Sequence, residues 1–162
     1  MADIVSLSKL SKGAIYWYYK SKKDVYLDLI NYWVLRYSAV INHLIEADHS
    51  SADQLKSLFH YFTKQFEKDP ALYKALMQFW TLASRDKDFQ KKLNKVYSNF
   101  LTLLENIITR GVKTGEFKKL NVKITALSIM VNIEGIIWFT LFDTKGISAR
   151  EYIETITDFI LS

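Results

Sequence analysis

The sequence predicts an all-α protein, because residues that break helices are rare and apolar residues recur at helical spacing. The chain has 162 residues, of which 49% are apolar, so it is long and apolar enough to bury a core. Glycine occurs five times and proline once. An all-β fold would need turn residues roughly every 8–12 positions. Long helices with short connections are therefore expected.

Capping signals divide the chain into eight expected helices and no strand. A side chain that can accept a hydrogen bond from a free backbone N–H favours the start of a helix, and glycine favours its end. The start signals are Ser11, Ser21 with Asp24, Ser51 with Gln54, Asp69 with Pro70, Asp86, Asn121, and Ser148 with Glu151. The expected helices span residues 2–8, 11–18, 21–47, 51–68, 69–84, 86–110, 121–142 and 148–162. Gly111 is the expected C-cap of the sixth helix, and residues 112–120 are expected to form a loop.

One of these helices is apolar on nearly all sides. The apolar segment of residues 124–142 is nearly as long as the roughly 20 residues that a membrane span needs. However, Asn132, Glu134 and Gly135 lie at its centre, and an acid in mid-membrane costs about 2.5–3.5 kcal/mol. A helix buried in a core or in a subunit interface fits this segment better, and no membrane partner is expected.

The composition argues against an enzyme or a metal site. Cysteine is absent and there are three histidines, so disulfides, thiolate ligands and cysteine nucleophiles are excluded. Glu46 and His49 have the spacing of a di-iron ligand pair, but such a site needs a second pair and two more glutamates. No cofactor is expected. The lack of cysteine suits the reducing cytoplasm, and no apolar leader segment is evident at the N-terminus.

Positive charge is concentrated near the N-terminus. Between Lys9 and Lys23 there are five lysines and no acid, whereas residues 31–162 carry a net charge of only +3. Two short helices joined by a turn of a few residues precede a long helix, which is the geometry that inserts a helix into a major groove about 12 Å wide. An apolar seam between the two short helices is expected from Ile4, Leu7, Leu10 and Ile15.

The segment from Asp3 to Val25 resembles the DNA-binding domain of the TetR family of bacterial and archaeal transcriptional repressors. The shared pattern is Ser-Lys-Gly-x-Ile-Tyr-x-Tyr-aromatic-x-Ser-Lys-x-x-apolar, from Ser11 to Val25. A weaker resemblance covers the Arg-Gly-Val-Lys-Thr-Gly-Glu-Phe run from Arg110 to Phe117, because family members carry a similar turn before the helix that builds the dimer.

This resemblance implies a recognition helix from Ser11 to Tyr18. Tyr16 and Lys22 match family residues that contact backbone phosphate, and a helix N-terminus such as that beside Lys22 attracts anions independently. The implied DNA-binding residues are Ser11, Lys12, Gly13, Ala14, Tyr16, Trp17, Tyr18 and Lys22.

Two features depart from the family pattern, one residue in the turn and one helix. Lys9 stands where the family usually has glycine in the turn, and a positive φ there would cost about 1 kcal/mol. The family also has a further helix ahead of the first helix expected here. The DNA-binding domain, residues 1–30, is therefore expected to be partial. The alternative is a ligand-binding helical dimer whose truncated head does not bind DNA.

The aromatic residues of the middle of the chain have two interpretations, an ordinary core or an apolar ligand pocket between helices. The resemblance implies a pocket in a ligand-binding and dimerising domain over residues 31–162, whose ligand shifts the two DNA-binding heads out of register. The expected lining is Trp33, Tyr37, Phe62, Phe66, Met77, Trp80, Tyr97, Phe100 and Asn132.

The sequence thus favours a cytoplasmic, homodimeric regulator of transcription. It would repress by binding a double-stranded DNA operator and would be released by a hydrophobic small molecule. The last two helices are expected to pair with those of a second copy. The residues expected at that interface are Ile129, Ile133, Ile136, Ile137, Ile153, Ile156 and Phe159.

Overall fold

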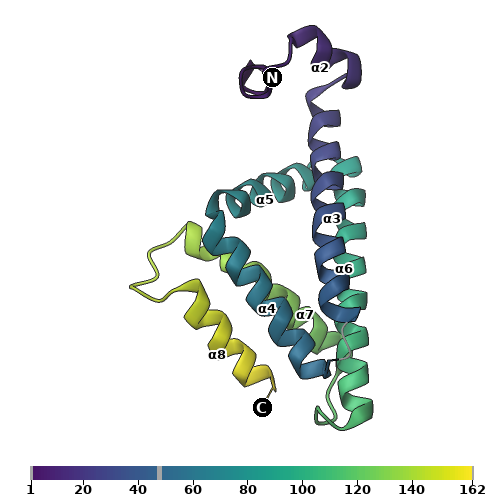
Figure 1. The fold of residues 1–162 in the computed structure, drawn as a ribbon, viewed down its shortest axis with the longest axis vertical. Helices are drawn as coiled ribbons and strands as arrows, with labels where there is room; N and C mark the ends of the chain where they lie inside the picture. The colour runs from purple at the N-terminus through teal and green to yellow at the C-terminus, as the bar shows by residue number, and fades with distance from the viewer. Residues whose placement is uncertain (1, 47–48, 162) are drawn as a thin grey trace. The chain divides into compact units, whose positions relative to one another are not determined.

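The computed structural model, which describes residues 2–46 and 49–161, is all α-helical as predicted (Figure 1). Over those residues it contains no strand. The helices are α1 (Ala2–Ser8), α2 (Lys12–Tyr18), α3 (Lys22–Glu46), α4 (Ser51–Lys68), α5 (Pro70–Ala83), α6 (Lys87–Thr114), α7 (Val122–Gly135), the 3-10 helix η1 (Ile136–Thr140) and α8 (Ala149–Leu161).

The chain forms two compact units, residues 1–40 and residues 41–162. The division falls within α3, later than the domain boundary expected at residue 30.

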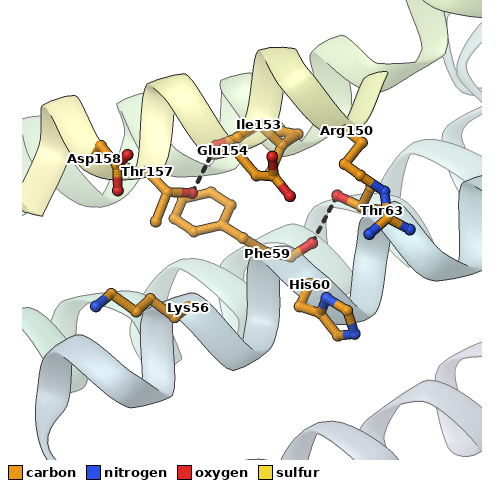
Figure 2. Close-up of a pocket in the computed structure, with 9 residues that line it drawn as sticks. All are labelled: Lys56, Phe59, His60, Thr63, Arg150, Ile153, Glu154, Thr157 and Asp158. Atoms are coloured by element: carbon orange, nitrogen blue, oxygen red, sulfur yellow. Dashed lines mark hydrogen bonds between the residues drawn. The ribbon is translucent and has the colours of Figure 1, made fainter. Parts of the chain in front are cut away.

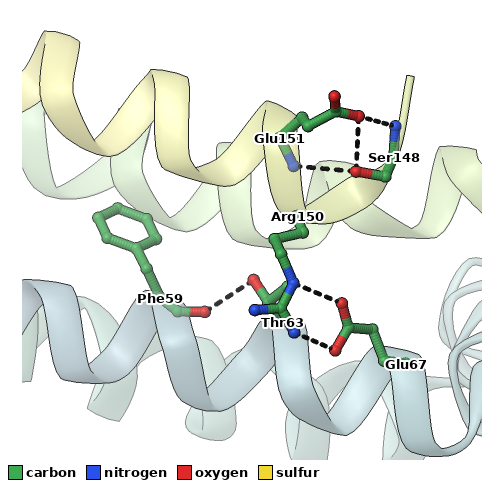
Figure 3. Close-up of polar contacts among 6 residues, drawn as sticks. All are labelled: Phe59, Thr63, Glu67, Ser148, Arg150 and Glu151. Atoms are coloured by element: carbon green, nitrogen blue, oxygen red, sulfur yellow. Dashed lines mark hydrogen bonds and ion pairs between the residues drawn. The ribbon is translucent and has the colours of Figure 1, made fainter.

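Several predicted helix starts are confirmed by their hydrogen bonds. The Ser11 side chain accepts from the Ala14 N–H at 3.1 Å, and the Asn121 side chain accepts from the Ile124 N–H at 3.1 Å. Ser148 and Glu151 form a reciprocal capping box at the start of α8, with bonds of 2.8 and 3.1 Å between each side chain and the other's backbone N–H (Figure 3).

The predicted cap of α4 is wrong by one residue. The Ser50 side chain accepts from the Asp53 N–H at 3.0 Å and donates to the Asp53 carboxylate at 2.7 Å. Ser51 and Gln54, the predicted pair, are buried instead. Consecutive serines, each with a suitable polar residue three positions later, give two overlapping capping patterns. Only burial of one pair distinguishes them.

The predicted end of α6 is also wrong. The helix continues through Gly111 to Thr114, and Gly115, with φ of 79°, is its left-handed C-cap. Gly111 is buried against the ring of Phe117, and a Cβ atom at this position would lie 2.3 Å from two ring carbons. Gly111 is therefore required for close approach rather than for a turn.

The core of the second unit lies where α4, α6, α7 and α8 meet. Helix α6 packs against α5 and α7, and α4 packs against α6 and α8; Figure 1 shows α4 and α8 side by side. The most deeply buried apolar side chains come from different helices and include Leu55, Leu58, Phe59, Leu104, Ile108, Ile129 and Ile136.

The prediction of which residues form the subunit interface is mostly wrong. Ile129, Ile133, Ile136, Ile137 and Ile153 are buried within their own chain and cannot meet a second copy. A helix that is apolar on all sides does not reveal which face meets the core. The exposed apolar face of α7 and η1, here called the α7 face, instead consists of Ile124, Leu127, Val131 and Trp138. Phe159 on α8 is exposed and Ile156 is half-buried, so their predicted contact with a second copy stays a prediction.

The same segment, Val122–Thr140, is the one stretch of the described chain with the length and hydropathy of a membrane span. Its mean hydropathy is 1.5, and 33% of it is buried within the structure. The buried part belongs to the core just described, so packing inside the chain accounts for part of this hydropathy.

In the first unit, α1 and α2 pack through fewer apolar residues than predicted. Ile15 is buried and Ile4 and Val5 are half-buried, but Leu7 is 85% exposed and Leu10 is 52% exposed. Among the described side chains of α1, a helix of seven residues, Ile4 and Val5 are half-buried and the others are exposed. Leu10 lies in the turn, where Lys9 has a φ of 57°. The predicted seam is therefore wrong for Leu7 and Leu10.

Lys9→Gly is expected to stabilise the first unit by about 1 kcal/mol or less, because the left-handed strain removed slightly exceeds the entropy cost of glycine. Amide hydrogen exchange within residues 4–18 should slow, although it should remain faster than in α7, because little apolar area is buried there. The control, Lys12→Gly, replaces the first residue of α2, where φ is not positive, and should not slow exchange. Unchanged or faster exchange in Lys9→Gly would contradict this expectation.

Candidate functional site

The first candidate site is the outward face of α2 in the first unit. Of the residues in this helix only Ile15 is buried. Trp17 is 80% exposed and Tyr18 is 73% exposed, and their rings meet edge to face at 4.7 Å. The predicted contacts Ser11, Lys12, Gly13 and Tyr16 are also exposed, and Ala14 is half-buried. The structure thus places seven of the predicted DNA-binding residues on one short helix and its cap.

Lysines beside aromatic rings give this face its charge. The Lys12 Nζ lies 6.0 Å from the centre of the Tyr16 ring, and the Lys22 Nζ lies 5.4 Å from the centre of the Tyr26 ring. Lys22 is the first residue of α3, where Ser21 and Asp24 form a capping box. Exposed cations at a helix start can contact phosphate oxygens, and the neighbouring aromatic groups can contact sugars or bases.

A hydrogen bond connects the end of α2 to α3. The Tyr19 hydroxyl donates to the Asp28 carboxylate at 2.7 Å, and this bond raises the pKa of Tyr19. The orientation of α2 within the first unit is therefore supported by a polar contact as well as by Ile15.

The second candidate site is the ring-rich interior predicted to hold a ligand. Trp33 and Tyr37 belong to the first unit and are half-buried. In the second unit, the rings of Phe62 and Phe100 meet at 5.7 Å, and the ring of Phe66 meets Tyr73 at 5.3 Å. Met77, another predicted pocket residue, is half-buried on α5.

A hydrogen bond joins α5 to α6, because the Trp80 N–H donates to the Tyr97 hydroxyl. Burial raises the pKa of Glu134, and burial together with the Glu134 charge raises the pKa of Tyr97. Trp80 and Tyr97 were predicted pocket residues, but Glu134 was not. Its signal in the sequence is an acid isolated in an apolar helix.

Asn132 lies apart from these rings. Its side-chain oxygen accepts from the Tyr152 hydroxyl of α8 at 2.5 Å, and its side-chain N–H donates to the Ser128 carbonyl at 2.8 Å. Residues 132 and 134 are separated by about 200° around a helix. Asn132 therefore faces α8, whereas Glu134 lies on the opposite side of α7.

A surface groove of about 320 Å³ lies elsewhere, between α4 and α8 (Figure 2). Its lining residues are Lys56, Phe59, His60, Thr63, Arg150, Ile153, Glu154, Thr157 and Asp158, and none of the predicted pocket residues is among them. Its basic side chains are Lys56 and His60 of α4 and Arg150 of α8, and its acidic side chains, Glu154 and Asp158, both come from α8. Beside it, Arg150 holds Glu67 through bonds of 2.9 and 2.6 Å (Figure 3), which lower the pKa of Glu67.

The Arg110 to Phe117 motif connects the end of α6 to the start of α4. The Arg110 guanidinium donates to the Ser51 hydroxyl at 3.0 Å and to the His49 carbonyl at 2.6 Å. The Glu116 carboxylate accepts from the Ala52 N–H at 3.1 Å, which lowers the pKa of Glu116. This set of contacts is called the Arg110–Glu116 clamp below. The charged groups of the motif thus satisfy backbone groups around the N-terminus of α4.

No group of metal-ligating side chains occurs among the residues that the structure describes. The Glu46 side chain, part of the pair considered above, lies outside the described side chains.

A helix-turn-helix head followed by a bundle of helices is the architecture of a DNA-binding regulator. Residues 34–142 match the family model described as "YsiA-like protein, C-terminal region". The chain belongs to the TetR family of transcriptional regulators, whose members are not enzymes.

Known proteins support this assignment. The fatty acid metabolism regulator protein of Bacillus subtilis is 22% identical over 135 residues, which cover 83% of this chain and 69% of the relative. The regulator FadR of Bacillus subtilis, solved in complex with stearoyl-CoA, has a TM-score of 0.83 at 18% identity, covering 99% of this chain and 86% of that one. A regulator from Saccharomonospora viridis, solved in complex with choline, has a TM-score of 0.89 at 20% identity, covering 98% and 83%. At these identities the structural matches show the fold.

Proposed function

We propose that this chain is a cytoplasmic, homodimeric transcriptional repressor that a hydrophobic small molecule releases from a double-stranded DNA operator. The observation that carries the proposal is the exposed face of α2, where lysines and aromatic side chains surround a helix N-terminus. Exposed aromatic rings beside cations are poor core residues and suitable DNA contacts.

The repression would depend on a pair of identical chains. Two recognition helices read successive major grooves when they lie about 34–36 Å apart. The α7 face is the surface proposed for pairing, since contiguous exposed apolar side chains mark interaction sites and a twofold interface is the commonest arrangement. A ligand that binds more tightly to another arrangement of the heads weakens DNA binding by its difference in affinity.

The ligand would bind among the helices of the second unit. Support comes from the half-buried rings of α4, α5 and α6 and from relatives that bind small molecules, stearoyl-CoA in one and choline in another. Because these two ligands differ in size and chemistry, the family supports ligand binding without naming the effector.

One observation favours a second candidate function. The exposure of Leu7 and Leu10 leaves α1 and α2 with little mutual packing. A head of this kind would suit a ligand-binding dimer that does not bind DNA.

Lys22→Ala is the variant that tests the proposal. Removing one phosphate contact per subunit should weaken binding on every DNA sequence alike, and should lower the slope of log affinity against log salt by about 1 per subunit. Fluorescence anisotropy with a selected operator and with a random duplex measures both. The control is Lys64→Ala, which removes an exposed lysine of α4 and should change neither the affinity nor the slope.

Two outcomes would count against the proposal. If Lys22→Ala left both affinity and slope unchanged, the residue would have no part in DNA contact. If the unaltered chain bound neither duplex at low salt, the ligand-binding dimer would be the better function.

A further inference from the structure

Helix α2 has little apolar packing to fix its direction within the first unit. Ile15 is the one residue of this helix that is buried. The helix packs against α1 through a small area, since Leu7 and Leu10 are exposed. A helix of seven residues that is held in this way can tilt unless another contact restrains it.

The hydrogen bond between Tyr19 and Asp28 supplies such a restraint. Tyr19 is the C-cap of α2, and its backbone N–H donates to the Ile15 carbonyl at 2.9 Å, which fixes the residue to the helix. Its side-chain hydroxyl donates to the Asp28 carboxylate of α3 at 2.7 Å. A hydrogen bond to an ionised acceptor is roughly twice as strong as one between neutral groups. The bond therefore joins the end of α2 directly to α3.

An acid next to the recognition helix does not help to attract DNA. Asp28 is exposed in the same unit as the lysines proposed to contact phosphate, and its negative charge repels the backbone of every sequence alike. Asp24, at the start of α3, caps that helix by accepting from the Ser21 N–H at 2.8 Å. Asp28 lies beyond this first turn, and the bond shown for it is that to Tyr19. Its contribution would therefore be orientation rather than attraction.

Orientation matters more for reading bases than for holding phosphates. The attraction between a lysine and a phosphate decays over a Debye length of about 8–10 Å, so it tolerates a small tilt of α2. A hydrogen bond to a base edge needs a donor–acceptor distance of about 2.7–3.2 Å and a nearly straight angle. These base contacts carry the sequence information. A tilt of α2 would therefore reduce discrimination between sequences before it reduced general affinity.

We propose that the Tyr19–Asp28 bond positions α2 for sequence discrimination. Tyr19 would raise the ratio of operator affinity to non-specific affinity without itself contacting DNA. This inference rests on the proposed function and concerns the partner of the same site, a duplex of one particular sequence. Tyr19 is a positioning residue, because it acts through the side chains of α2.

Tyr19→Phe tests this role, because it removes the hydroxyl, keeps the ring and leaves the net charge unchanged. Anisotropy uses the full chain, a random duplex and an operator selected from a random pool with the unaltered chain. The operator affinity should fall at least about fivefold. The affinity for the random duplex should stay within about twofold, and its slope against salt should not change. The control, Tyr32→Phe, removes a hydroxyl from an exposed position of α3 and should not alter the ratio.

Two substitutions of Asp28 separate the hydrogen bond from the charge. Asp28→Asn removes the charge but keeps an acceptor for the Tyr19 hydroxyl, so both duplexes should bind more tightly and the ratio should stay within about twofold. Asp28→Ala removes the acceptor as well and should lower the ratio at least about fivefold. Combining Asp28→Ala with Tyr19→Phe should lower it no further, because both substitutions break one bond.

The ionisation of Tyr19 reports the bond in the absence of DNA. The hydrogen bond to the Asp28 carboxylate raises the pKa of the Tyr19 hydroxyl. Asp28→Ala should therefore lower this pKa toward the ordinary value of about 10. Nuclear magnetic resonance of ring-labelled tyrosine measures the pKa, and Tyr19→Phe assigns the signal. An unchanged pKa would overturn the inference, since the bond would not form in solution.

The DNA measurements separate this inference from the proposed function. Equal losses on both duplexes in Tyr19→Phe would mean that the hydroxyl contacts DNA directly. An unchanged ratio, or additive losses in the double variant, would mean that the bond does not position α2. Each of these results overturns the inference while DNA binding stands. If the unaltered chain bound neither duplex, the proposed function would fail and the inference with it, whatever the pKa of Tyr19.

Discussion

Gly111→Ala is expected to destabilise the second unit by about 1–3 kcal/mol, the usual cost of forcing atoms into a packed site. The new Cβ would lie 2.3 Å from two carbons of the Phe117 ring and 3.0 Å from the ring carbon nearest the backbone, so the whole ring must move. Because Phe117 also returns a backbone hydrogen bond to the Gly111 carbonyl at 3.0 Å, its backbone cannot move freely. Urea unfolding measures the loss.

Gly135→Ala is a matched control for this substitution. Gly135 is also a helical glycine, but the atom nearest its added Cβ is the Tyr152 hydroxyl at an ordinary 3.7 Å. Alanine there should be neutral or stabilising by up to about 1 kcal/mol, since alanine favours helix. In a double-mutant cycle, Gly111→Ala should cost less free energy of unfolding in the Phe117→Ala background than in the unaltered chain. An equal cost in both backgrounds would show that the ring is not the cause.

Val131→Glu is expected to convert the proposed dimer into a monomer. Val131 is 55% exposed at the centre of the α7 face, and a second copy would bury its glutamate beside an identical one. DNA affinity should fall at least about 100-fold, because the two half-sites would no longer be bound by one linked molecule. Sedimentation at micromolar concentration measures the assembly, and anisotropy measures the affinity.

Two further variants locate the effect. Asn99→Glu, on an exposed position of α6, should leave the dimer intact. Ile133→Glu should unfold the second unit rather than dissociate it, because Ile133 is buried within its own chain. A dimer that persisted in Val131→Glu, or a monomer in the unaltered protein, would mean that the α7 face is not the interface.

Most helix starts could be predicted because capping depends on residues a few positions apart. Asn121 and Ser148 need only their own neighbours to cap α7 and α8, and local pattern was sufficient. The choice between Ser50 and Ser51 was not local, since it depended on which serine faces Arg110, a residue far along the chain. The choice between Gly111 and Gly115 as the C-cap of α6 was not local either. Both are glycines near one helix end, and only packing against Phe117 separates them.

In the candidate sites, too, features set by neighbouring residues could be predicted and features set by helix packing could not. The head is a short motif in which the contacts that orient α2 come from nearby residues, so its exposed face could be predicted. The interior could be predicted only as a set of rings, because α7 is apolar on all sides. That Asn132 bonds to Tyr152 of α8, and Trp80 to Tyr97, depends on how helices distant in the sequence pack.

The Arg110–Glu116 clamp has a consequence for the lifetime of the folded chain. Its contacts join residues 59 to 64 positions apart, and closing a long loop costs entropy that must be offset by contacts already made. We expect the clamp to form after α4, α5 and α6 have packed, and so after the main barrier to folding. Interactions made that late slow unfolding and leave the folding rate nearly unchanged. The motif would therefore set how long the second unit stays folded rather than how quickly it folds.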